Sequence, residues 1–491
     1  MEIDRLYGHW IDGKRQPSTS GASFDSVSPV TGEVVAKVAL AEAADVDLAV
    51  LAARRAAPGW GALAASERGD LIFALTEAVK SAGKDLAALD AAETGRPILD
   101  CEEDIPAAAS ILRYFGGAAD KLQGSTMPVQ PGYHARTVYE PFGVVAAVVP
   151  WNYPIYNACV KLGPALAAGN TCVLKPAEES SLSALLLGEL ASQCGFPDGV
   201  LNVIAGPGEV SGAALAEHMG VDKLSFTGST ETGRQIMAAA AGSNLKHLTL
   251  ELGGKSPAIV FDDANLEAAA NSLAFSVFFN QGQTCTAATR LLVQDAVADA
   301  FVERLVVKAK NIRVGDPQAE DSQLGTVVSE AQYRRVLAYL DEAKASRATI
   351  ECGGGALQVE GFENGLFVAP TVISNVTSDM SFGREEIFGP VLSVMRFSDE
   401  DEAVALANDS KYGLAASIWT RDGSRLARLS SRVEAGIVWG NCAFVENAGV
   451  PVGGYGQSGW GREYGMDAMR EYSRLKTVWT DFTDTAFEWV V

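Results

Sequence analysis

Histidine and closely paired cysteines are scarce in this sequence. Its 491 residues include four histidines, none near another, which argues against a metal site built on histidine. The seven cysteines are odd in number, scattered and never spaced as CxxC, which disfavours a disulfide framework or a zinc ribbon. Free thiols are typical of a reducing compartment, so we expect a cytoplasmic protein. The charged start, Met1–Arg5, lacks the apolar core of a signal peptide, and no uninterrupted apolar run approaches a membrane span.

Basic residues are also in deficit. There are 39 Lys and Arg against 61 Asp and Glu, a formal net charge of −22. Such a negative field repels nucleic acid and anionic membranes, so we expect neither as a partner. Hydrophobic residues make up 48% and charged residues 20%, as in ordinary globular domains, and the length suggests roughly two to four domains or subdomains.

Short apolar runs alternate with helical segments from Thr137 onward. The runs cover residues 144–149, 171–174, 200–204, 223–226 and 248–252. This alternation is typical of a parallel sheet covered on both faces. A second α/β series begins near residue 256 and continues to residue 439. The sequence therefore predicts an α/β fold with a doubly wound first domain, residues 1–121 and 141–253, and a second domain, residues 254–458.

Two segments fit neither domain. Residues 122–140 place a Pro-Gly turn between β-prone flanks, and residues 476–482 carry Val478, Thr480 and Phe482 at alternate positions. Both patterns predict exposed strands that need a partner. We assign residues 122–140 and 470–491 to a small β unit. Its apolar tail, residues 485–491, predicts burial against another subunit.

Glycines and a serine follow two of the predicted strands. Gly208 and Gly212 follow one, and Gly228 and Ser229 follow Phe226 at the end of the next. Such strand ends present backbone N–H groups to a phosphate, assisted by the helix dipole. Neither segment matches GxGxxG, and turn glycines with a helix N-cap explain each motif about as well.

A lysine and a carboxylate, Lys175 and Glu178, end the strand at 171–174. Ligands of open α/β sheets bind at this end of the strands, where the pair would hold ribose hydroxyls. The carboxylate would repel a 2′-phosphate. A solvated ion pair is the competing interpretation.

Three further residues have catalytic potential. Cys285 lies between two threonines in a stretch of small residues, Glu251 ends an apolar strand before two glycines, and Asn152 also follows a strand. They suit a nucleophile, a general base and an oxyanion donor. Taken singly, a buried structural thiol, a solvated strand end and a helix cap are the ordinary alternatives.

The order of the motifs is more specific than any one of them. Along the chain come Pro150-Trp151-Asn152, Lys175-Pro176-Ala177-Glu178, Phe226-Thr227-Gly228-Ser229, Glu251-Leu252-Gly253-Gly254-Lys255, Gly282-Gln283-Thr284-Cys285, Glu386-Ile387-Phe388-Gly389-Pro390 and Pro451 to Gly461. This series closely resembles the NAD(P)-dependent aldehyde dehydrogenase superfamily over essentially the whole chain. The resemblance implies a Rossmann-like NAD-binding domain, a catalytic domain and a small β oligomerisation flap.

The resemblance also implies roles for single residues. Cys285 would be the nucleophile, Glu251 the base that activates water, and Asn152, with the Cys285 backbone N–H, the oxyanion hole. The implied cofactor is NAD, with NADP as a second option. Its binding residues would be Trp151, Lys175, Glu178, Gly208, Gly212, Phe226, Gly228, Ser229, Glu386 and Phe388. Lys161 and Glu463 match positions on a proton or water path. No metal is implied.

Substrate is harder to infer. The implied pocket wall is Tyr153, Asn157, Val160, Thr284, Thr286, Phe444 and Glu446, where Asn157 and Val160 suggest a roomier and more polar opening. One hypothesis is that Glu446 attracts a cationic group, as in an aminoaldehyde; a solvated loop glutamate is the alternative. Gly456 replaces a lysine common in the family.

The expected partners are a small aldehyde and further copies of the chain, in a homodimer or homotetramer. Two other functions compete with NAD-dependent oxidation to the acid. A CoA-acylating relative would transfer the acyl group to a thiol, against which Glu251 argues. A catalytically silent binding or structural homologue would not need Asn152, Glu251 and Cys285 together. The thiol should also be partly ionised near neutral pH to act as a nucleophile.

Overall fold

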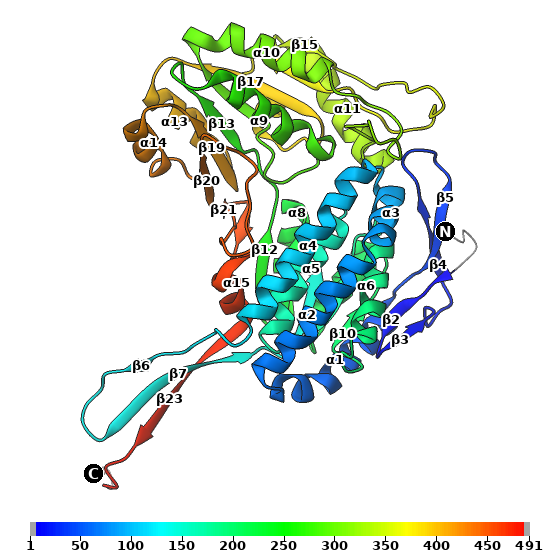
Figure 1. Ribbon diagram of the computed structural model, residues 1–491, viewed down its shortest axis with the longest axis vertical. Helices are drawn as coiled ribbons and strands as arrows, with labels where there is room; N and C mark the ends of the chain where they lie inside the picture. Colours follow the sequence, from blue (N-terminus) through cyan, green and yellow to red (C-terminus); the bar gives the residue numbers. More distant parts are fainter. Residues whose placement is uncertain (1–5, 486–491) are drawn as a thin grey trace.

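The computed structural model describes residues 6–485, which form two α/β units and a projecting three-stranded arm (Figure 1). The fold is the mixed α/β class expected from the sequence. The tail from residue 486 to 491, for which burial was predicted, lies outside the described residues, as do residues 1–5.

The first unit is built on a mixed sheet. Its strand order is β22 (Gly459–Trp460), β12 (His247–Glu251), β11 (Lys223–Thr227), β8 (Val144–Val148), β9 (Thr171–Lys175), β10 (Leu201–Val203), β2 (His9–Ile11) and β3 (Lys14–Gln16). The five strands from β12 to β10 are parallel, whereas β22 and β2 pair antiparallel at the two sides. The chain proceeds from β8 through β9 to β10 and then returns to place β11 beside β8. This reversal is the topological switch point, where open α/β sheets bind ligands.

Helices cover both faces of this sheet. They are α1 (Ala43–Ala62), α2 (Ala65–Ser81), α3 (Gly83–Thr94), α4 (Ile98–Ala118), α5 (Pro154–Ala167), α6 (Leu182–Gln193), α7 (Ala213–Glu217), α8 (Thr230–Gly242) and α15 (Gly465–Glu471). β8 is buried along its whole length, as its uninterrupted apolar sequence predicts. α4 and α5 pack so closely that a Cβ at Gly163 would lie 2.8 Å from the Phe115 ring. Each fully buried Leu or Phe side chain here contributes about 1.5–3 kcal/mol.

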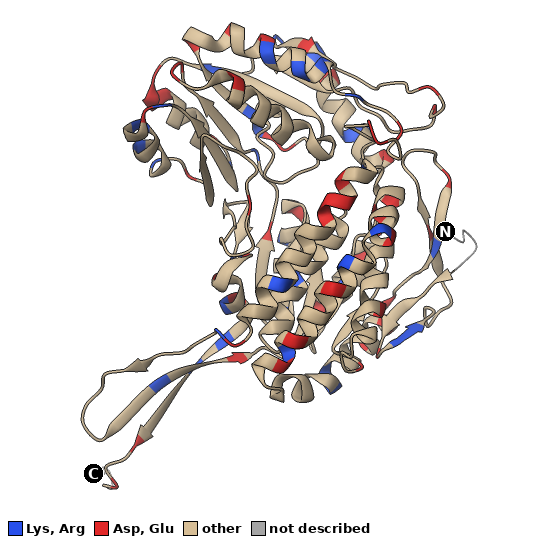
Figure 2. Ribbon diagram, in the orientation of Figure 1, with Lys and Arg blue, Asp and Glu red and all other residues tan. Residues whose placement is uncertain are grey.

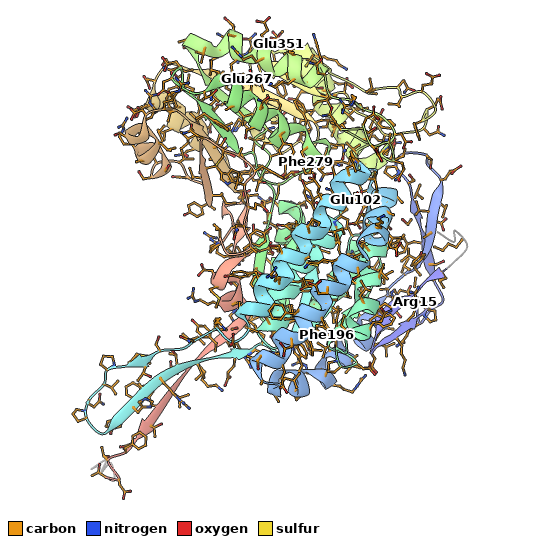
Figure 3. All side chains as sticks on the ribbon, viewed as in Figure 1. Arg15, Glu102, Phe196, Glu267, Phe279 and Glu351 are labelled. Carbon is orange, nitrogen blue, oxygen red and sulfur yellow. The ribbon has the colours of Figure 1, made fainter. Side chains whose placement is uncertain are left out.

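The second unit has a similar layout. Its sheet runs β15 (Thr349–Cys352), β16 (Thr371–Ser374), β17 (Val391–Phe397), β14 (Arg290–Gln294), β13 (Pro257–Val260), β19 (Ala415–Trp419) and β20 (Ile437–Gly440). All pairs are parallel except β15 with β16. The covering helices are α9 (Leu266–Phe278), α10 (Ala298–Lys310), α11 (Glu330–Ala345), α12 (Ser381–Arg384), α13 (Glu400–Asn408) and α14 (Gly423–Ser430). Phe279, just after α9, lies on the side that faces the first unit (Figure 3).

The arm is formed by segments distant in sequence. β7 (Tyr133–Pro141) pairs antiparallel with β23 (Ser473–Asp481) over nine residues, and β6 (Thr126–Met127) adds to β7. The pair projects from the first unit (Figure 1). Leu475 and Trp479 are 59% and 57% exposed, so the arm presents large apolar side chains to its surroundings.

Two small sheets complete the described chain. One joins β1 (Leu6–Tyr7), β5 (Val34–Ala39) and β4 (Ser23–Val27), and the other joins β18 (Tyr412–Gly413) to β21 (Tyr455–Gly456). The pairing of β18 with β21 explains why position 456 is a glycine. Its φ of +56° is left-handed, and a Cβ there would lie 2.9 Å from the Lys411 carbonyl oxygen, so a lysine would be strained.

Charged residues are distributed over both units. Figure 2 shows Asp and Glu on many helices and loops rather than on one element. Within residues 6–485, no helix has the length and apolar character needed to cross a membrane. The same residues contain no cluster of three or more His, Cys, Asp or Glu side chains suited to holding a metal ion.

Candidate active site

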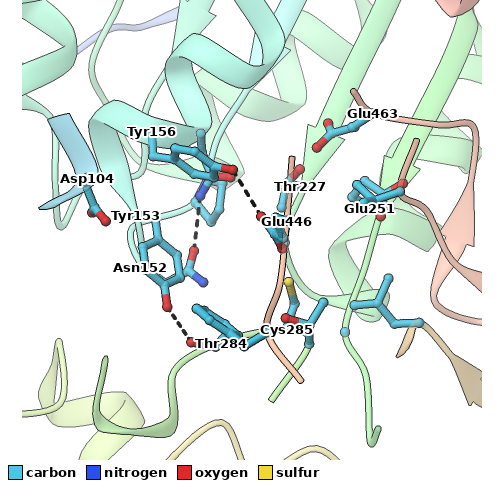
Figure 4. A pocket seen from close by; sticks show the side chains of 18 of the residues that line it. Asp104, Asn152, Tyr153, Tyr156, Thr227, Glu251, Thr284, Cys285, Glu446 and Glu463 are labelled. Atoms are coloured by element: carbon cyan, nitrogen blue, oxygen red, sulfur yellow. Dashed lines mark hydrogen bonds between the residues drawn. The ribbon is translucent and has the colours of Figure 1, made fainter. Parts of the chain in front are cut away.

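A cavity of about 580 Å³ lies between the two units at the carboxyl ends of β8, β11 and β12. Its wall includes Asn152, Glu251 and Cys285, which lie 99 and 34 residues apart in sequence. In the close view of Figure 4, Cys285 lies between Asn152 on one side and Glu251 on the other. The fold therefore brings together the three residues with catalytic potential.

Cys285 is held by an unusual loop between α9 and β14. Asn280, Gln281 and Gly282 have successive φ values of +50°, +55° and +70°, all left-handed. This conformation costs roughly 1–2 kcal/mol for each residue with a side chain. Gly282 is required, because a Cβ there would lie 2.1 Å from the Gly389 carbonyl oxygen. The tight turn places the half-buried Cys285 at the cavity wall.

Asn152 is fixed beside this loop. Its Nδ2 donates to the Gln283 carbonyl at 2.9 Å, and its own carbonyl accepts from Asn280 Nδ2 at 2.8 Å. An amide nitrogen carries two N–H groups, so one of them can still face the cavity. That geometry suits a donor to an oxyanion formed on a carbon attached to Cys285.

Glu251 ends β12 next to a pair of glycines. A Cβ at Gly253 would lie 2.2 Å from Glu386 Oε2, and a Cβ at Gly254 would lie 2.6 Å from the Cys285 carbonyl oxygen. Only glycine lets the strand end approach both the nucleophile loop and Glu386. Burial raises the pKa of Glu251 well above its usual value, and the nearby Glu463 carboxylate raises it further.

The Cys285 thiol shares the cavity wall with several carboxylates. Burial raises its pKa, and the carboxylates of Glu446, Glu251, Glu386 and Glu463 raise it further because they repel a thiolate. These effects work against a partly ionised thiol near neutral pH, which stays a prediction.

Glu463 and Lys161 form a buried ion pair behind Glu251. The Lys161 Nζ and Glu463 Oε1 atoms are 2.5 Å apart, and Lys161 also donates to Ser225 Oγ at 3.2 Å. Glu463 lines the cavity, whereas Lys161 lies deeper. The two residues thus connect the cavity wall to the polar interior of the first unit.

One end of the cavity carries half of the expected cofactor residues: Trp151, Gly228, Ser229, Glu386 and Phe388. The rings of Trp151 and Phe388 meet edge to face, with centroids 5.4 Å apart. Glu386 Oε1 accepts from the Gly254 N–H at 2.9 Å, and burial raises the pKa of Glu386 to about 7. No donor from residues 6–485 reaches its second oxygen, which suits an acceptor for ribose hydroxyls.

Two of these residues, Ser229 and Gly228, also have a structural role. Ser229 Oγ accepts from the Thr232 N–H at 3.1 Å and caps α8. The Gly228 N–H donates to the Glu251 carbonyl at 3.0 Å, and a Cβ at Gly228 would lie 2.4 Å from the Phe226 ring. Backbone geometry and helix capping therefore explain Gly228 and Ser229 as well as cofactor binding does.

The other cofactor residues lie outside this cavity. Phe226 is packed in the core, and the buried Lys175 ammonium lies 3.5 Å from Glu178. Gly208 and Gly212 have open space where a Cβ would be, since no atom lies within 4 Å. A ligand that extends from Glu386 past the start of α8 would have room over these glycines. The residues present thus fit an elongated dinucleotide.

The opposite end of the cavity holds most of the predicted substrate pocket. Tyr153, Asn157, Thr284, Thr286, Phe444 and Glu446 line it. Val160 does not, contrary to prediction, because it lies on the core side of α5 and is 2% exposed. The Tyr153 and Thr284 hydroxyls are 2.6 Å apart, which ties α5 to the residue before Cys285 (Figure 4).

Glu446 makes contacts that its sequence neighbours did not reveal. Its Oε2 accepts from the Tyr156 and Tyr464 hydroxyls at 3.1 and 3.3 Å. Burial of the carboxyl group raises the pKa of Glu446, and the Tyr156 and Tyr464 hydroxyls lower it because they donate to the ionised form. Part of the residue is exposed. The carboxylate can therefore meet a ligand in the cavity.

Several lining residues were not predicted. They come from α4 (Glu103, Asp104, Ala107, Ser110 and Ile111), from α9 and its end (Phe275 and Phe279), and from Tyr156 and Tyr464. Buried Arg96 pairs with Asp104 at 2.5 Å and lies 4.5 Å from the Tyr153 ring centroid. In sequence these positions look like ordinary parts of amphipathic helices. Their place at the cavity follows only from the way the two α/β units pack together.

Comparison with known proteins agrees with this site. The aldehyde dehydrogenase family model matches residues 16–478. Aldehyde dehydrogenase family 2 member B4, mitochondrial, from Arabidopsis thaliana is 43% identical over 480 residues, covering 97% of this chain and 88% of the relative. The structure is similar to PnpE of Pseudomonas sp. WBC-3 in complex with nicotinamide adenine dinucleotide, with a TM-score of 0.96, 44% identity and 99% coverage of both chains. It is also similar to betaine aldehyde dehydrogenase from Staphylococcus aureus in complex with NAD+, with a TM-score of 0.96, 37% identity and 99% coverage of both chains. On these grounds the chain belongs to the aldehyde dehydrogenase family.

Proposed function

We propose that this NAD-using aldehyde dehydrogenase oxidises its aldehyde to the carboxylic acid through a covalent bond to Cys285. The observation that carries the proposal is that Cys285, Asn152 and Glu251 line one cavity. They supply a nucleophile, an oxyanion donor and a base. A catalytically silent homologue would not need this combination.

The chemistry begins at the thiol. Once its proton is lost, the Cys285 sulfur attacks the aldehyde carbon, and the resulting oxyanion accepts hydrogen bonds from Asn152 Nδ2 and the Cys285 backbone N–H. When bound, NAD supplies the acceptor for the hydride that this carbon loses. The residues that would hold it include Trp151, Glu386 and Phe388 near the reacting end.

Hydrolysis of the resulting thioester falls to Glu251. Its carboxylate takes a proton from water, and the hydroxide releases the acid and restores the thiol. The raised pKa makes Glu251 a stronger base than an exposed glutamate. We further propose that Glu463 and Lys161 carry the proton away, because this ion pair adjoins the cavity beside Glu251.

Absorbance at 340 nm tests the proposal. The protein is mixed with NAD, NADP or neither and with a panel of aldehydes, in the presence and absence of coenzyme A. Acid formation that is independent of coenzyme A supports hydrolysis by Glu251. Strict dependence on coenzyme A would instead favour the acylating alternative, and no NADH with any aldehyde would favour a silent homologue.

The raised pKa of Cys285 gives a testable pH dependence. Without cofactor, alkylation by iodoacetamide should accelerate only above the ordinary range of a thiol pKa, because the thiolate is the reactive form. The positive nicotinamide ring of NAD should favour the thiolate and move the profile to lower pH. Mass spectrometry of the Cys285 peptide measures both profiles. Identical profiles would reject activation by the cofactor.

We propose a polar, cationic aldehyde as the substrate class. Glu103 and Glu446 line the cavity together with aromatic side chains, whereas Asp104, also in the wall, is already paired with Arg96. Carboxylates and aromatic rings both attract a substituted ammonium group. The likeness to a betaine aldehyde dehydrogenase fits, because betaine aldehyde carries a quaternary ammonium.

Glu446→Gln tests this substrate class. For an aminoaldehyde and a neutral isostere, the ratio of kcat/KM values should fall by about 10-fold, equivalent to ~1.4 kcal/mol, because one carboxylate charge is lost. Glu303→Gln, an exposed change on α10, is the matched control and should leave the ratio unchanged. An unaltered ratio in Glu446→Gln would remove the hypothesis.

We also propose the domain division and assembly expected from the sequence. Separate sheets support an NAD-binding domain (residues 1–121 and 141–253) and a catalytic domain (residues 254–458). Exposed Leu475 and Trp479 on the arm support an oligomerisation role for segments 122–140 and 470–491, in a homodimer or homotetramer. Light scattering distinguishes these states. The seven unpaired cysteines fit a cytoplasmic location.

A further inference from the structure

The loop before Cys285 contains a buried amide that the proposed chemistry does not use. Asn280 is 0% exposed and has a left-handed φ of +50°. Asparagine tolerates this conformation better than most residues, yet tolerance alone does not explain where its side chain points. Both of its amide hydrogens have acceptors inside the protein.

These acceptors join the two sides of the site. Asn280 Nδ2 donates to the Asn152 carbonyl at 2.8 Å and to the Gln283 carbonyl at 3.2 Å. The Gln283 carbonyl accepts in addition from Asn152 Nδ2 at 2.9 Å. One carbonyl oxygen, two residues before the nucleophile, therefore holds both asparagine amides with its two lone pairs.

The remaining atoms of the Asn152 amide are also constrained. Asn157 Nδ2 lies 3.4 Å from Asn152 Oδ1, within the same cavity wall. With its oxygen directed to Asn157 and one N–H directed to Gln283, the second N–H of Asn152 has a defined direction. An oxyanion donor is effective only when it is aimed in advance at the place where charge develops.

We propose that Asn280 is a positioning residue that holds Asn152, and thereby the oxyanion hole, in register with Cys285. Asn280 acts through Asn152 and does not touch the substrate. The inference rests on the proposed role of Asn152. It predicts that Asn280 matters only while Asn152 is present.

A double-mutant cycle measures this dependence. Asn280→Gly keeps the left-handed backbone allowed and removes both donors. With the best aldehyde of the panel, it should lower kcat by about 10- to 100-fold and leave the KM for NAD within about twofold. Asn152→Ala should lower kcat by about 10²- to 10³-fold. The double variant should then have a kcat within about threefold of Asn152→Ala alone.

Two further variants separate positioning from folding. Asn375→Gly is the matched control, because Asn375 also has a left-handed φ (+56°) and donates from Nδ2, to Thr349 Oγ1, but does not line the cavity. It should keep the wild-type kcat. Asn280→Asp retains the shape of the side chain and loses the N–H donors. It should lower kcat by the amount expected for Asn280→Gly, and it replaces that variant if Asn280→Gly folds poorly.

Several outcomes would overturn the proposal. An unchanged kcat in Asn280→Gly, or losses that multiply in the double variant, would reject action through Asn152 while leaving the proposed function intact. Failure of both Asn280 variants to fold, judged by thermal melting, would assign Asn280 to the fold alone. An Asn152→Ala variant as active as the wild type would refute the oxyanion role of Asn152 and, with it, this inference.

Discussion

Cys285→Ala should abolish NAD-dependent aldehyde oxidation, with kcat lower by at least about 10⁴-fold, because Cys285 is the one thiol among the described residues that line the cavity. Cofactor binding should persist, since Cys285 lies at the nucleophile loop and the wall formed by Trp151, Glu386 and Phe388 is unchanged. Initial rates at 340 nm and NAD titration by tryptophan fluorescence measure the two properties separately.

The chain offers a matched control for this change. Cys194 is also a free, half-buried cysteine, but it ends α6 and does not line the cavity. Cys194→Ala should retain the wild-type rate. Residual oxidation in Cys285→Ala close to the wild-type rate would refute the covalent mechanism, whereas equal losses in both variants would indicate damage to the fold.

Glu251→Gln should separate the two halves of the reaction. Formation of the thioester needs no water, so a rapid burst of about one NADH per active site should survive. Steady-state turnover should fall by about 10²- to 10⁴-fold, the usual contribution of a general base. Stopped-flow absorbance gives the burst, and mass spectrometry of the quenched protein should show an acyl group on Cys285.

The pH dependence adds a second test of Glu251. Because its folded-state pKa is raised, the carboxyl is protonated and inactive as a base below that pKa. Wild-type turnover limited by hydrolysis should therefore rise with pH, and Glu251→Gln should lose that rise. Glu217→Gln, an exposed change on α7, should keep it. Loss of the burst in Glu251→Gln would place Glu251 before thioester formation, as an activator of the thiol.

The sequence was sufficient for the fold class and for most cavity residues at strand ends. β8 and β9 are buried along their whole length and β12 is buried at Thr249 and Leu250, so the sequence could place Asn152, Lys175 and Glu251 at strand ends. The family resemblance then linked these positions to Cys285. Local pattern was informative where a motif follows a strand, as at Asn152, Lys175 and Glu251, whereas the motifs of Cys285 and Glu386 follow α9 and α12.

Other features could not be read from sequence because they arise where distant elements meet. Asp104 belongs to an amphipathic helix, and its place at the cavity follows from how α4 packs beside α5. The prediction that Val160 lines the pocket was wrong for a related reason, because its position on α5 directs it to the core and not to the cavity. The raised pKa of Cys285 likewise comes first from burial and then from four carboxylates spread over the chain.

The C-terminal segment has a consequence for biosynthesis. β22 pairs with the strand that ends in Glu251, Ser458 Oγ donates to the Gly253 carbonyl at 2.7 Å, and Glu463 completes the wall. On the ribosome, Cys285 is made 178 residues before Glu463. At about 5–20 residues per second, the nascent chain carries its thiol for roughly ten seconds or longer before the active site can close. Synthesis order thus delays catalytic competence until nearly the whole polypeptide has emerged.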